Sequence, residues 1–235
     1  MVDPSKKVIL ITGSSRGIGK VLAEHYLSNG WFVVGCSRGE GSIVNDSYKH
    51  FSCSVADEKG VKAIFGYLQK EHGVLTALIN NAGRASMNHA LLTPLSKLQE
   101  LVDANLTGTF LFSREGAKLM SRKRYGRIVN FSTVAVPLSL EGEAAYVATK
   151  SAVVSLTKVL AKELGPLGIT VNAVGPTPVK TDLISGVPDN KLEKLLDAQA
   201  IRRFGEFRDV VNAVDFFIKP ESDFITGQIL YLGGV

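Results

Sequence analysis

A short apolar run followed at once by three glycines is the feature that most constrains this chain. Residues 8–11 read Val-Ile-Leu-Ile, which is typical of a parallel strand covered on both faces. Gly13, Gly17 and Gly19 follow, and apolar residues then recur at helical spacing over 21–27. A strand that turns through glycines into a helix directs backbone N–H groups and the positive helix end at one place, which suits a pyrophosphate. The alternative is a glycine-rich turn without a ligand, so the rest of the chain has to decide.

The alternation of strand and helix patterns continues along the chain, which predicts an α/β fold with a parallel sheet. No repeat, low-complexity tract or linker interrupts it, so we expect a single domain over residues 1–235. Residues 39–48 are expected to form a polar connection shorter than a full helix. Further strands are expected at 31–35, 50–55, 75–79, 128–131, 169–174 and 225–231, and helices at 58–70, 95–122, 143–164, 189–200 and 209–218.

Composition narrows the classes of partner. The net charge of +5, with 45% apolar and 21% charged residues, suits phosphate-bearing small molecules or an acidic carrier protein, but is too diffuse to indicate nucleic acid. Cys36 and Cys53 have neither metal-ligand nor redox-motif spacing, so we expect free thiols and no metal site. The N-terminus lacks the apolar core of a signal peptide and no apolar run approaches membrane length, so a cytoplasmic protein is expected.

The glycine spacing points to one family. Gly-x-x-x-Gly-x-Gly differs from the Gly-x-Gly-x-x-Gly fingerprint of the general dinucleotide fold. With Thr12 in front, it resembles the cofactor loop of the short-chain dehydrogenase/reductase family, in particular its 3-oxoacyl-acyl-carrier-protein reductases. The resemblance covers nearly the whole chain and implies a Rossmann-type, doubly wound, seven-stranded parallel sheet in the order 3-2-1-4-5-6-7, with helices on both faces. It assigns cofactor contacts in this loop to Gly13, Ser15, Arg16, Gly17, Ile18 and Gly19.

The end of the second strand predicts which nicotinamide cofactor binds. In a doubly wound sheet this strand end meets the adenosine ribose, where an acidic residue would accept a hydrogen bond from the 2′-hydroxyl of NAD. Ser37 stands where NAD-binding family members usually carry Asp, and Arg38 follows it. An arginine fork there matches a 2′-phosphate, and Arg16 could approach from the other side. The alternative is two solvated surface arginines; we expect NADP(H).

Two further strand ends resemble the adenosine pocket of the family. Where the family commonly has Asp-Val after the third strand, this chain has Ser-Val and keeps only the second residue. The Asn-Asn-Ala-Gly at 80–83 matches the family motif, in which small residues let the backbone lie beside the adenosine. The resemblance therefore assigns cofactor contacts to Ser54, Val55, Asn81, Ala82 and Gly83.

Tyr146 and Lys150 are the predicted chemical centre. Four residues apart on a predicted helix, they lie on one face. A phenol titrates near pH 10, and we expect the lysine ammonium, with the charge of an oxidised nicotinamide, to lower that pKa. Tyr146 could then protonate the alkoxide forming from a ketone, or deprotonate an alcohol in the reverse direction. The resemblance adds that both residues contact the cofactor and that Lys150 holds the ribose hydroxyls of the nicotinamide.

The reacting carbonyl also needs a neutral hydrogen-bond donor. The family places a serine 13 residues before the tyrosine, and this chain has Thr133 there, with the same hydroxyl and a stiffer χ1. Ser132 is the neighbouring alternative. Asn105 lies within the helical stretch 95–122, and the family Asn at this point contributes to a helix irregularity and a water site beside the lysine. A purely structural Asn105 is the alternative.

The chain departs from the family pattern after the sixth and seventh strands. Thr177 replaces the glycine of the usual Pro-Gly, and Leu232 replaces the aspartate of the usual Asp-Gly-Gly. Val179 and Thr181 match the positions that shield and hydrogen-bond the nicotinamide carboxamide. Residues 182–205 are the expected substrate lid.

These features predict an NADPH-dependent oxidoreductase that reduces a ketone to a secondary alcohol, or catalyses the reverse, with a 3-oxoacyl thioester among the substrates to consider. The changes at Thr133, Thr177 and Leu232 motivate an alternative, a catalytically silent NADP-binding regulatory or scaffold protein.

The resemblance also suggests partners besides the small-molecule carbonyl or alcohol. Family members pair helices like 95–122 and 144–164, so a homotetramer or homodimer is expected. An acyl carrier protein could dock at Arg124, although Leu167 occupies the position of the second docking arginine.

Overall fold

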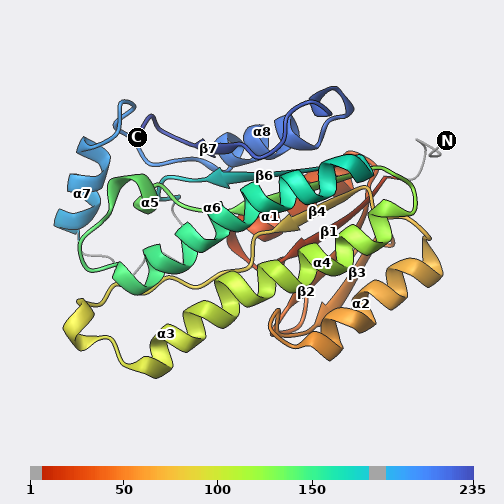
Figure 1. The fold of residues 1–235 in the computed structure, drawn as a ribbon, viewed down its shortest axis with the longest axis horizontal. Coiled ribbons are helices and arrows are strands. Elements are labelled where there is room, and N and C mark those ends of the chain that lie inside the picture. Colours follow the sequence, from red (N-terminus) through yellow and green to blue (C-terminus); the bar gives the residue numbers. More distant parts are fainter. Residues whose placement is uncertain (1–6, 180–188) are drawn as a thin grey trace.

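The computed structural model describes residues 7–179 and 189–235, and these form one parallel seven-stranded sheet with helices on both faces (Figure 1). The strand order is β3-β2-β1-β4-β5-β6-β7, so the predicted Rossmann-type fold is confirmed. The strands are β1 (Val8–Thr12), β2 (Phe32–Ser37), β3 (Tyr48–Ser52), β4 (Ala77–Asn80), β5 (Gly126–Phe131), β6 (Ile169–Gly175) and β7 (Ile229–Tyr231).

The strand order fixes where a ligand can bind. β1 pairs with β2 on one side and with β4 on the other, so the chain reverses its winding direction at β1. Connections from β1 and β4 leave on opposite faces, which opens a crevice at the carboxyl ends of these two strands. The glycine turn and the Asn-Asn-Ala-Gly segment both lie at this crevice because they follow β1 and β4 directly.

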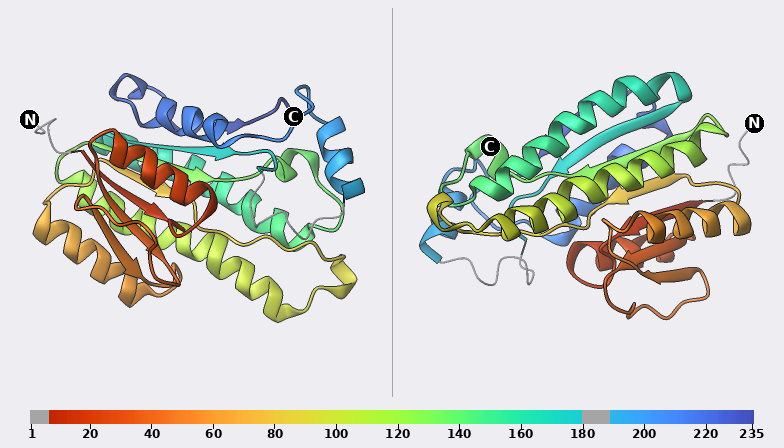
Figure 2. Two further views of the ribbon diagram at one scale, coloured as in Figure 1. Left: turned by 180° about the vertical axis from the view of Figure 1, so that it is seen from behind. Right: turned by 60° about the horizontal axis from the view of Figure 1, so that its bottom comes forward.

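Helices cover the two faces as the alternation of side chains requires. Val8 and Leu10 belong to the core beneath α2 (Glu58–Glu71), α4 (Gly108–Ser121) and α6 (Ala144–Leu164), which face the viewer in Figure 1. Ile9 and Ile11 belong to the second core, beneath α1 (Gly17–Ser28) and α8 (Phe207–Ile218), seen from behind in Figure 2. Successive strand residues point to opposite faces, and both faces are buried, so β1 is apolar throughout.

A chain of buried amides ties the front helices to the sheet. The side chain of Asn80 on β4 donates to Ser113 on α4 (2.9 Å) and to Asn130 on β5 (2.8 Å). Asn130 in turn donates to Thr157 on α6 (2.9 Å). Buried polar groups without partners are costly, so these bonds favour one position of each helix on the sheet. The position of Tyr146 and Lys150 on α6 depends on this register.

The long helix expected at 95–122 is one of the elements that the structure changes. It consists of α3 (Leu95–Leu101), a π-helical segment η2 (Val102–Thr107) and α4, so Asn105 lies in the irregular part. A π-helical turn inserts an extra residue and shifts the carbonyl pattern, which frequently marks a functional site. The irregularity implied by the family resemblance is therefore present.

Two expected strands are shifted or shorter. The strand expected at 50–55 is β3, which ends at Ser52, so Ser54 and Val55 follow it. The strand expected at 225–231 is only β7, because Gly227 has φ +72° and the hydroxyl of Thr226 accepts the Val171 N–H of β6 (3.0 Å) in place of a ladder bond. Both strands are half-exposed edges, where periodicity is a weak guide.

The remaining elements agree with the sequence within a few residues. Helix α7 spans Asp189–Asp197 and is shorter than expected, and α8 begins at Phe207 because Glu206 and Asp209 form a capping box. Thr181 and the first part of the expected lid at 182–205 lie outside the described residues.

Among the described residues, no helix is long and apolar enough to cross a membrane. Short helical turns are α5 (Ala135–Leu138), η1 (Ala90–Leu92), η3 (Gly165–Leu167) and η4 (Pro220–Ser222).

The close approach of α1 to the glycine turn gives a test of the fold. A Cβ at Gly19 would overlap the carbonyl oxygen of Gly13, so Gly19→Ala forces backbone movement and should destabilise the protein by about 1–3 kcal/mol. Gly66, on the exposed face of α2, has open space where a Cβ would lie, so Gly66→Ala should stabilise by about 0.5–1 kcal/mol. Urea unfolding without cofactor measures both, and equal effects of the two substitutions would contradict this account of α1 packing.

Candidate active site

A large groove follows the crevice at the carboxyl ends of β1, β2 and β4. Its volume is about 1140 Å³. Most of the residues that the family resemblance assigns to the cofactor line it, from the glycine turn, the end of β2, the segment after β3 and the segment after β4. They are Gly13, Ser15, Arg16, Gly17, Ile18, Ser37, Arg38, Ser54, Val55, Asn81, Ala82 and Gly83.

The glycine turn is held in shape by Asn81. The amide of Asn81 donates to the carbonyl oxygens of Thr12 (2.9 Å) and Gly13 (3.3 Å), which joins the ends of β4 and β1. Gly13 has φ +71° and Gly17 has φ +54°, a conformation that favours glycine. Gly19 lies beneath the turn rather than on the groove wall, because it lets α1 pack against Gly13. The third glycine is therefore required for packing, and its predicted cofactor contact stays a prediction.

The groove fits an anionic dinucleotide. The first turn of α1 carries no acidic residue, and Arg16 and Lys20 lie on the groove beside it. A helix N-terminus with cations and unobstructed backbone is favourable for a pyrophosphate. Arg38 is exposed at the end of β2, next to the buried Ser37. The residues present therefore fit a phosphate-bearing nicotinamide cofactor.

A smaller cavity of about 280 Å³ adjoins this groove and contains the predicted chemical centre. Thr133, Tyr146, Lys150 and Val179 all line it. The two spaces are contiguous, because they share the wall residues Ile18, Asn81, Gly83, Arg84 and Ala85. The remaining wall is largely apolar. It includes Met87, Val134, Leu140, Pro176, Pro178 and Leu195.

The hydroxyl of Thr133, and not that of Ser132, lies beside Tyr146. Thr133 hydrogen-bonds the phenol of Tyr146 and also accepts the backbone N–H of Ala135 (3.2 Å). Ser132 is buried and interacts with Tyr231 at the edge of the sheet. Both residues line the cavity, but only Thr133 interacts with the phenol of Tyr146. Thr133 therefore lies next to Tyr146 in the cavity, and its role as carbonyl donor stays a prediction.

Asn105 and Lys150 meet around Gly83. The side-chain amide of Asn105 accepts from the N–H of Arg84 (2.8 Å) and donates to its carbonyl oxygen (3.0 Å) and to Thr149 on α6 (2.9 Å). The ammonium of Lys150 donates to the carbonyl oxygen of Phe131 (2.8 Å). A Cβ at Gly83 would lie 3.0 Å from Asn105 Oδ1 and 3.3 Å from Lys150 Nζ, so a larger residue there would press on both side chains.

Burial dominates the acid–base properties of the protein groups. It raises the pKa of Tyr146 well above its ordinary value, against the hydrogen bond from Thr133, and the carboxylate of Glu143 raises it further. Burial lowers the pKa of Lys150 to about 8. The sequence predicts that Lys150 and an oxidised nicotinamide together lower the pKa of Tyr146. In the protein by itself the pKa is raised, because desolvation of the phenolate is the largest effect. The lowered pKa in the presence of the cofactor stays a prediction.

The unusual Thr177 has a partner of its own. Its hydroxyl donates to the side-chain oxygen of Gln199, and both residues are buried. Gln199 also donates to the carbonyl oxygen of Arg203 (3.3 Å). Leu232 keeps a backbone bond to the carbonyl oxygen of Gly175 (2.9 Å), so the family aspartate is not needed for this contact.

Sequence reasoning missed several residues around the groove. Arg84 lies between the two cavities and forms an ion pair with Glu100 on α3 (2.5 Å). Its position directly after the Asn-Asn-Ala-Gly segment could have indicated this. Glu143 was not predicted either, although it precedes Tyr146 by one helical turn. Tyr48 and His50, behind the end of β2, carry no motif that could have singled them out.

Comparison with known proteins places this site in a family. The family model described as enoyl-(acyl carrier protein) reductase matches residues 13–234. A 3-oxoacyl-[acyl-carrier-protein] reductase, FabG of Vibrio cholerae, is 32% identical over 234 residues, which cover 97% of this chain and 96% of the relative. The chain belongs to the short-chain dehydrogenase/reductase family. It is therefore an oxidoreductase of the type that interconverts ketones and alcohols with a nicotinamide cofactor.

Solved structures of other short-chain dehydrogenases/reductases agree with this assignment. Ligand-free aldohexose dehydrogenase of Thermoplasma acidophilum superposes with a TM-score of 0.87 at 32% identity, covering 97% of this chain and 93% of that one. The structure of ElxO with NADP bound gives 0.88 at 29% identity, covering 97% of both chains. The fold and the order of elements are thus those of the family along nearly the whole length.

The buried ammonium of Lys150 should affect stability. Its folded pKa of about 8 lies below the ordinary value of 10.5, so the unfolded chain binds more protons between these values and stability should rise with pH across that window. Lys150→Met should be more stable than the wild type at pH 7, by on the order of 1–3 kcal/mol, and the advantage should shrink toward pH 10. Urea unfolding at pH 7 and at pH 9.5 measures this.

The exposed Lys158 on the same helix provides the matched control. Lys158→Met should keep the pH dependence of the wild type. A Lys150→Met variant that is less stable than the wild type at both pH values would contradict the lowered pKa.

Proposed function

We propose that this protein reduces a ketone to a secondary alcohol, or oxidises the alcohol in reverse, with NADP(H) as its cofactor. The observation that carries the proposal is the meeting of Thr133, Tyr146 and Lys150 in one cavity that is contiguous with a basic dinucleotide groove. The alternative of a catalytically silent protein is less well supported, since the hydroxyl of Thr133 contacts Tyr146 and Thr177 has a buried partner.

Each protein group has a role in the proposed reaction. The bound nicotinamide cofactor would supply or accept the hydride. Tyr146 donates its phenolic proton to the carbonyl oxygen during reduction, and takes it back during oxidation. Thr133 donates a hydrogen bond to the same oxygen, where charge develops. Lys150 would hold the ribose hydroxyls of the nicotinamide, and its ammonium favours the phenolate of Tyr146. Asn105 fixes the backbone at Gly83 and Arg84 around the lysine.

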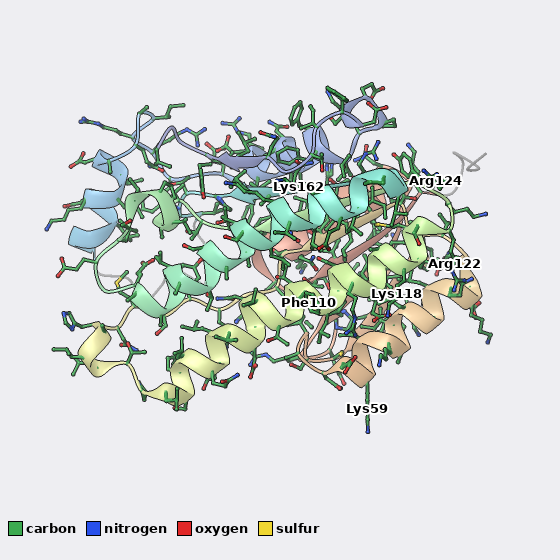
Figure 3. All side chains as sticks on the ribbon, in the orientation of Figure 1. Lys59, Phe110, Lys118, Arg122, Arg124 and Lys162 are labelled. Atoms are coloured by element: carbon green, nitrogen blue, oxygen red, sulfur yellow. The ribbon has the colours of Figure 1, made fainter. Side chains whose placement is uncertain are left out.

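The apolar cavity wall supports a substrate whose reacting carbon carries apolar groups. A 3-oxoacyl thioester, the substrate named for the FabG relatives, is one candidate. Docking of an acyl carrier at Arg124 has weaker support. Arg124 donates to the carbonyl oxygen of Pro166 (2.7 Å) at the C-terminal end of α6, at the opposite end of the molecule from α7 (Figure 3). Tyr146 and Leu164 are 18 residues apart on α6, which is about 27 Å of helix. A carrier bound at Arg124 would therefore lie at the far end of α6 from Tyr146.

Self-association through the front helices stays a prediction. Phe110 on α4 is 43% exposed and lies on the face shown in Figure 3, and Val159 on α6 is 51% exposed. Apolar side chains on two neighbouring helices suit a contact with the same helices of a second copy in a homodimer or homotetramer.

Cofactor preference tests the role of Arg38. A charge-assisted fork to the 2′-phosphate contributes roughly 1.5–3 kcal/mol, so NADPH should bind at least about tenfold more tightly than NADH. Arg38→Gln should remove most of this preference and leave the affinity for NADH nearly unchanged. Fluorescence titration of both cofactors into the wild type and the variant measures the four dissociation constants. Tighter binding of NADH to the wild type would reject the assignment to NADP(H).

A series at the end of β5 tests the carbonyl donor. Thr133→Val removes the hydroxyl and nearly keeps the shape, so kcat should fall by on the order of 10²–10³ while NADPH binding is unchanged. Thr133→Ser should keep most activity, and Ser132→Ala should have a mild effect because Thr133, and not Ser132, interacts with Tyr146. Turnover of a panel of ketones, diketones and acyl thioesters at saturating NADPH provides the assay. Loss of activity in Ser132→Ala alone would mean that the donor has been misassigned.

A further inference from the structure

A line of hydrogen bonds runs behind the groove wall at the end of β2. Ser14 in the glycine turn contacts the phenol of Tyr48 (3.0 Å), and Tyr48 contacts Nδ1 of His50 (2.9 Å). Nε2 of His50 lies 3.0 Å from the carbonyl oxygen of Gly39. The line therefore connects the turn that faces the pyrophosphate site with the turn that carries Arg38. Ser14, Tyr48 and His50 are not among the residues that line the groove.

The partners of His50 Nε2 set the direction of the bonds. Nε2 contacts the carbonyl oxygen of Gly39 (3.0 Å) and the hydroxyl of Ser37 (3.1 Å). The carbonyl can only accept, and Ser37 already donates to that carbonyl, so both contacts are satisfied when Nε2 carries the proton. In the neutral imidazole Nδ1 is then the acceptor, and Tyr48 donates to it. The oxygen of Tyr48 in turn accepts from Ser14. Gly35 is required beneath this line, because a Cβ there would overlap both Tyr48 and Ser14.

The Gly39 carbonyl is held more firmly than an exposed turn usually is. Besides His50 it accepts from the hydroxyls of Ser37 (2.9 Å) and Ser52 (3.2 Å). The turn also packs against the imidazole, since a Cβ at Gly41 would lie 2.6 Å from Cγ of His50. Three donors and a ring contact thus fix the backbone on either side of the exposed Arg38 side chain. A fixed backbone lowers the entropy that a long side chain loses when it binds an anion.

We infer that His50 is a positioning residue for cofactor selection. By donating from Nε2 to Gly39, it holds the turn that presents Arg38 to the 2′-phosphate, and so favours NADPH over NADH without contacting either. This inference rests on the proposed NADP(H) function. It concerns the end of β2, so the pyrophosphate and nicotinamide ends of the groove should not depend on it.

Two substitutions of His50, by Gln and by Asn, test this role, because their side-chain amides differ in reach by one methylene group. The side chain of His50→Gln can place an N–H near the position of Nε2 and still donate to Gly39, whereas that of His50→Asn reaches only as far as Nδ1. His50→Asn should weaken NADPH binding three- to tenfold and leave NADH binding within about twofold, because one hydrogen bond is lost at the Arg38 turn. His50→Gln should stay close to the wild type for both cofactors. Dissociation constants from fluorescence titration, at one pH and ionic strength, give the ratio directly.

Tyr48→Phe separates the two ends of the line. It removes the contact with Ser14 and leaves the bond from His50 to Gly39 available, so any change should be equal for NADPH and NADH. Thermal unfolding of each variant shows whether it is folded. The inference is overturned if His50→Asn keeps the wild-type ratio, or weakens both cofactors by the same factor, as a general structural defect would. A wild type without preference for NADPH would instead reject the proposed function itself.

Discussion

The buried side-chain amide of Asn105 joins the parts from which the site is made. It binds both the N–H and the carbonyl oxygen of Arg84 and donates to Thr149, so it connects the segment after β4, the π-helical turn and α6. Asn105 is fully buried, and leaving any of these groups without a partner would be costly. The π-helical segment is what brings this amide inward, since a regular α-helix would rotate it relative to α3 and α4. The distance between Gly83 and Lys150 follows from this arrangement.

Burial sets the chemistry of the site as well as its geometry. Removal from water disfavours both the phenolate of Tyr146 and the ammonium of Lys150. It therefore raises the pKa of Tyr146 and lowers the pKa of Lys150. Without a further charge, Tyr146 is therefore a neutral phenol, and Lys150 gives up its proton more readily than an exposed lysine does. A neutral phenol suits the reduction of a carbonyl, in which the forming alkoxide takes the phenolic proton. The charge of an oxidised nicotinamide would favour the opposite form.

The departures from the family pattern are matched by local contacts. Thr177 is a threonine where a glycine is usual, and the buried Gln199 at the end of the segment after α7 accepts its hydroxyl. Gly205 lies against Thr177, where a Cβ would come within 2.8 Å of its methyl group, so the loop after β6 is closely packed on a second side. Thr133 keeps the hydroxyl that the chemistry needs. These contacts are consistent with a site that is retained, with its own substrate loop.

The sequence by itself determined the elements whose burial is complete. We could locate β1, β4, β5, β6 and the amphipathic α2 to within a few residues. In these elements the apolar residues of the sequence pattern are the residues that the fold buries. The half-exposed β3 and β7 were misplaced, since edge strands have little periodicity and bonds such as that from Val171 to Thr226 replace the ladder. The spacing of Tyr146 and Lys150 was also enough to predict that they lie side by side, because residues i and i+4 of a helix share a face.

Only the tertiary structure decided which side chains meet. Whether Thr133 or Ser132 faces Tyr146 depends on the direction of each side chain at the end of β5, which sequence spacing alone suggests but does not fix. The sign of the tyrosine pKa shift depends on burial, which the packing of α6 on the sheet sets. The bonds from Ser14 through Tyr48 and His50 to Gly39 join the glycine turn, β3 and the turn after β2. Local patterns carry no information about such contacts, because they form only when the strands have paired.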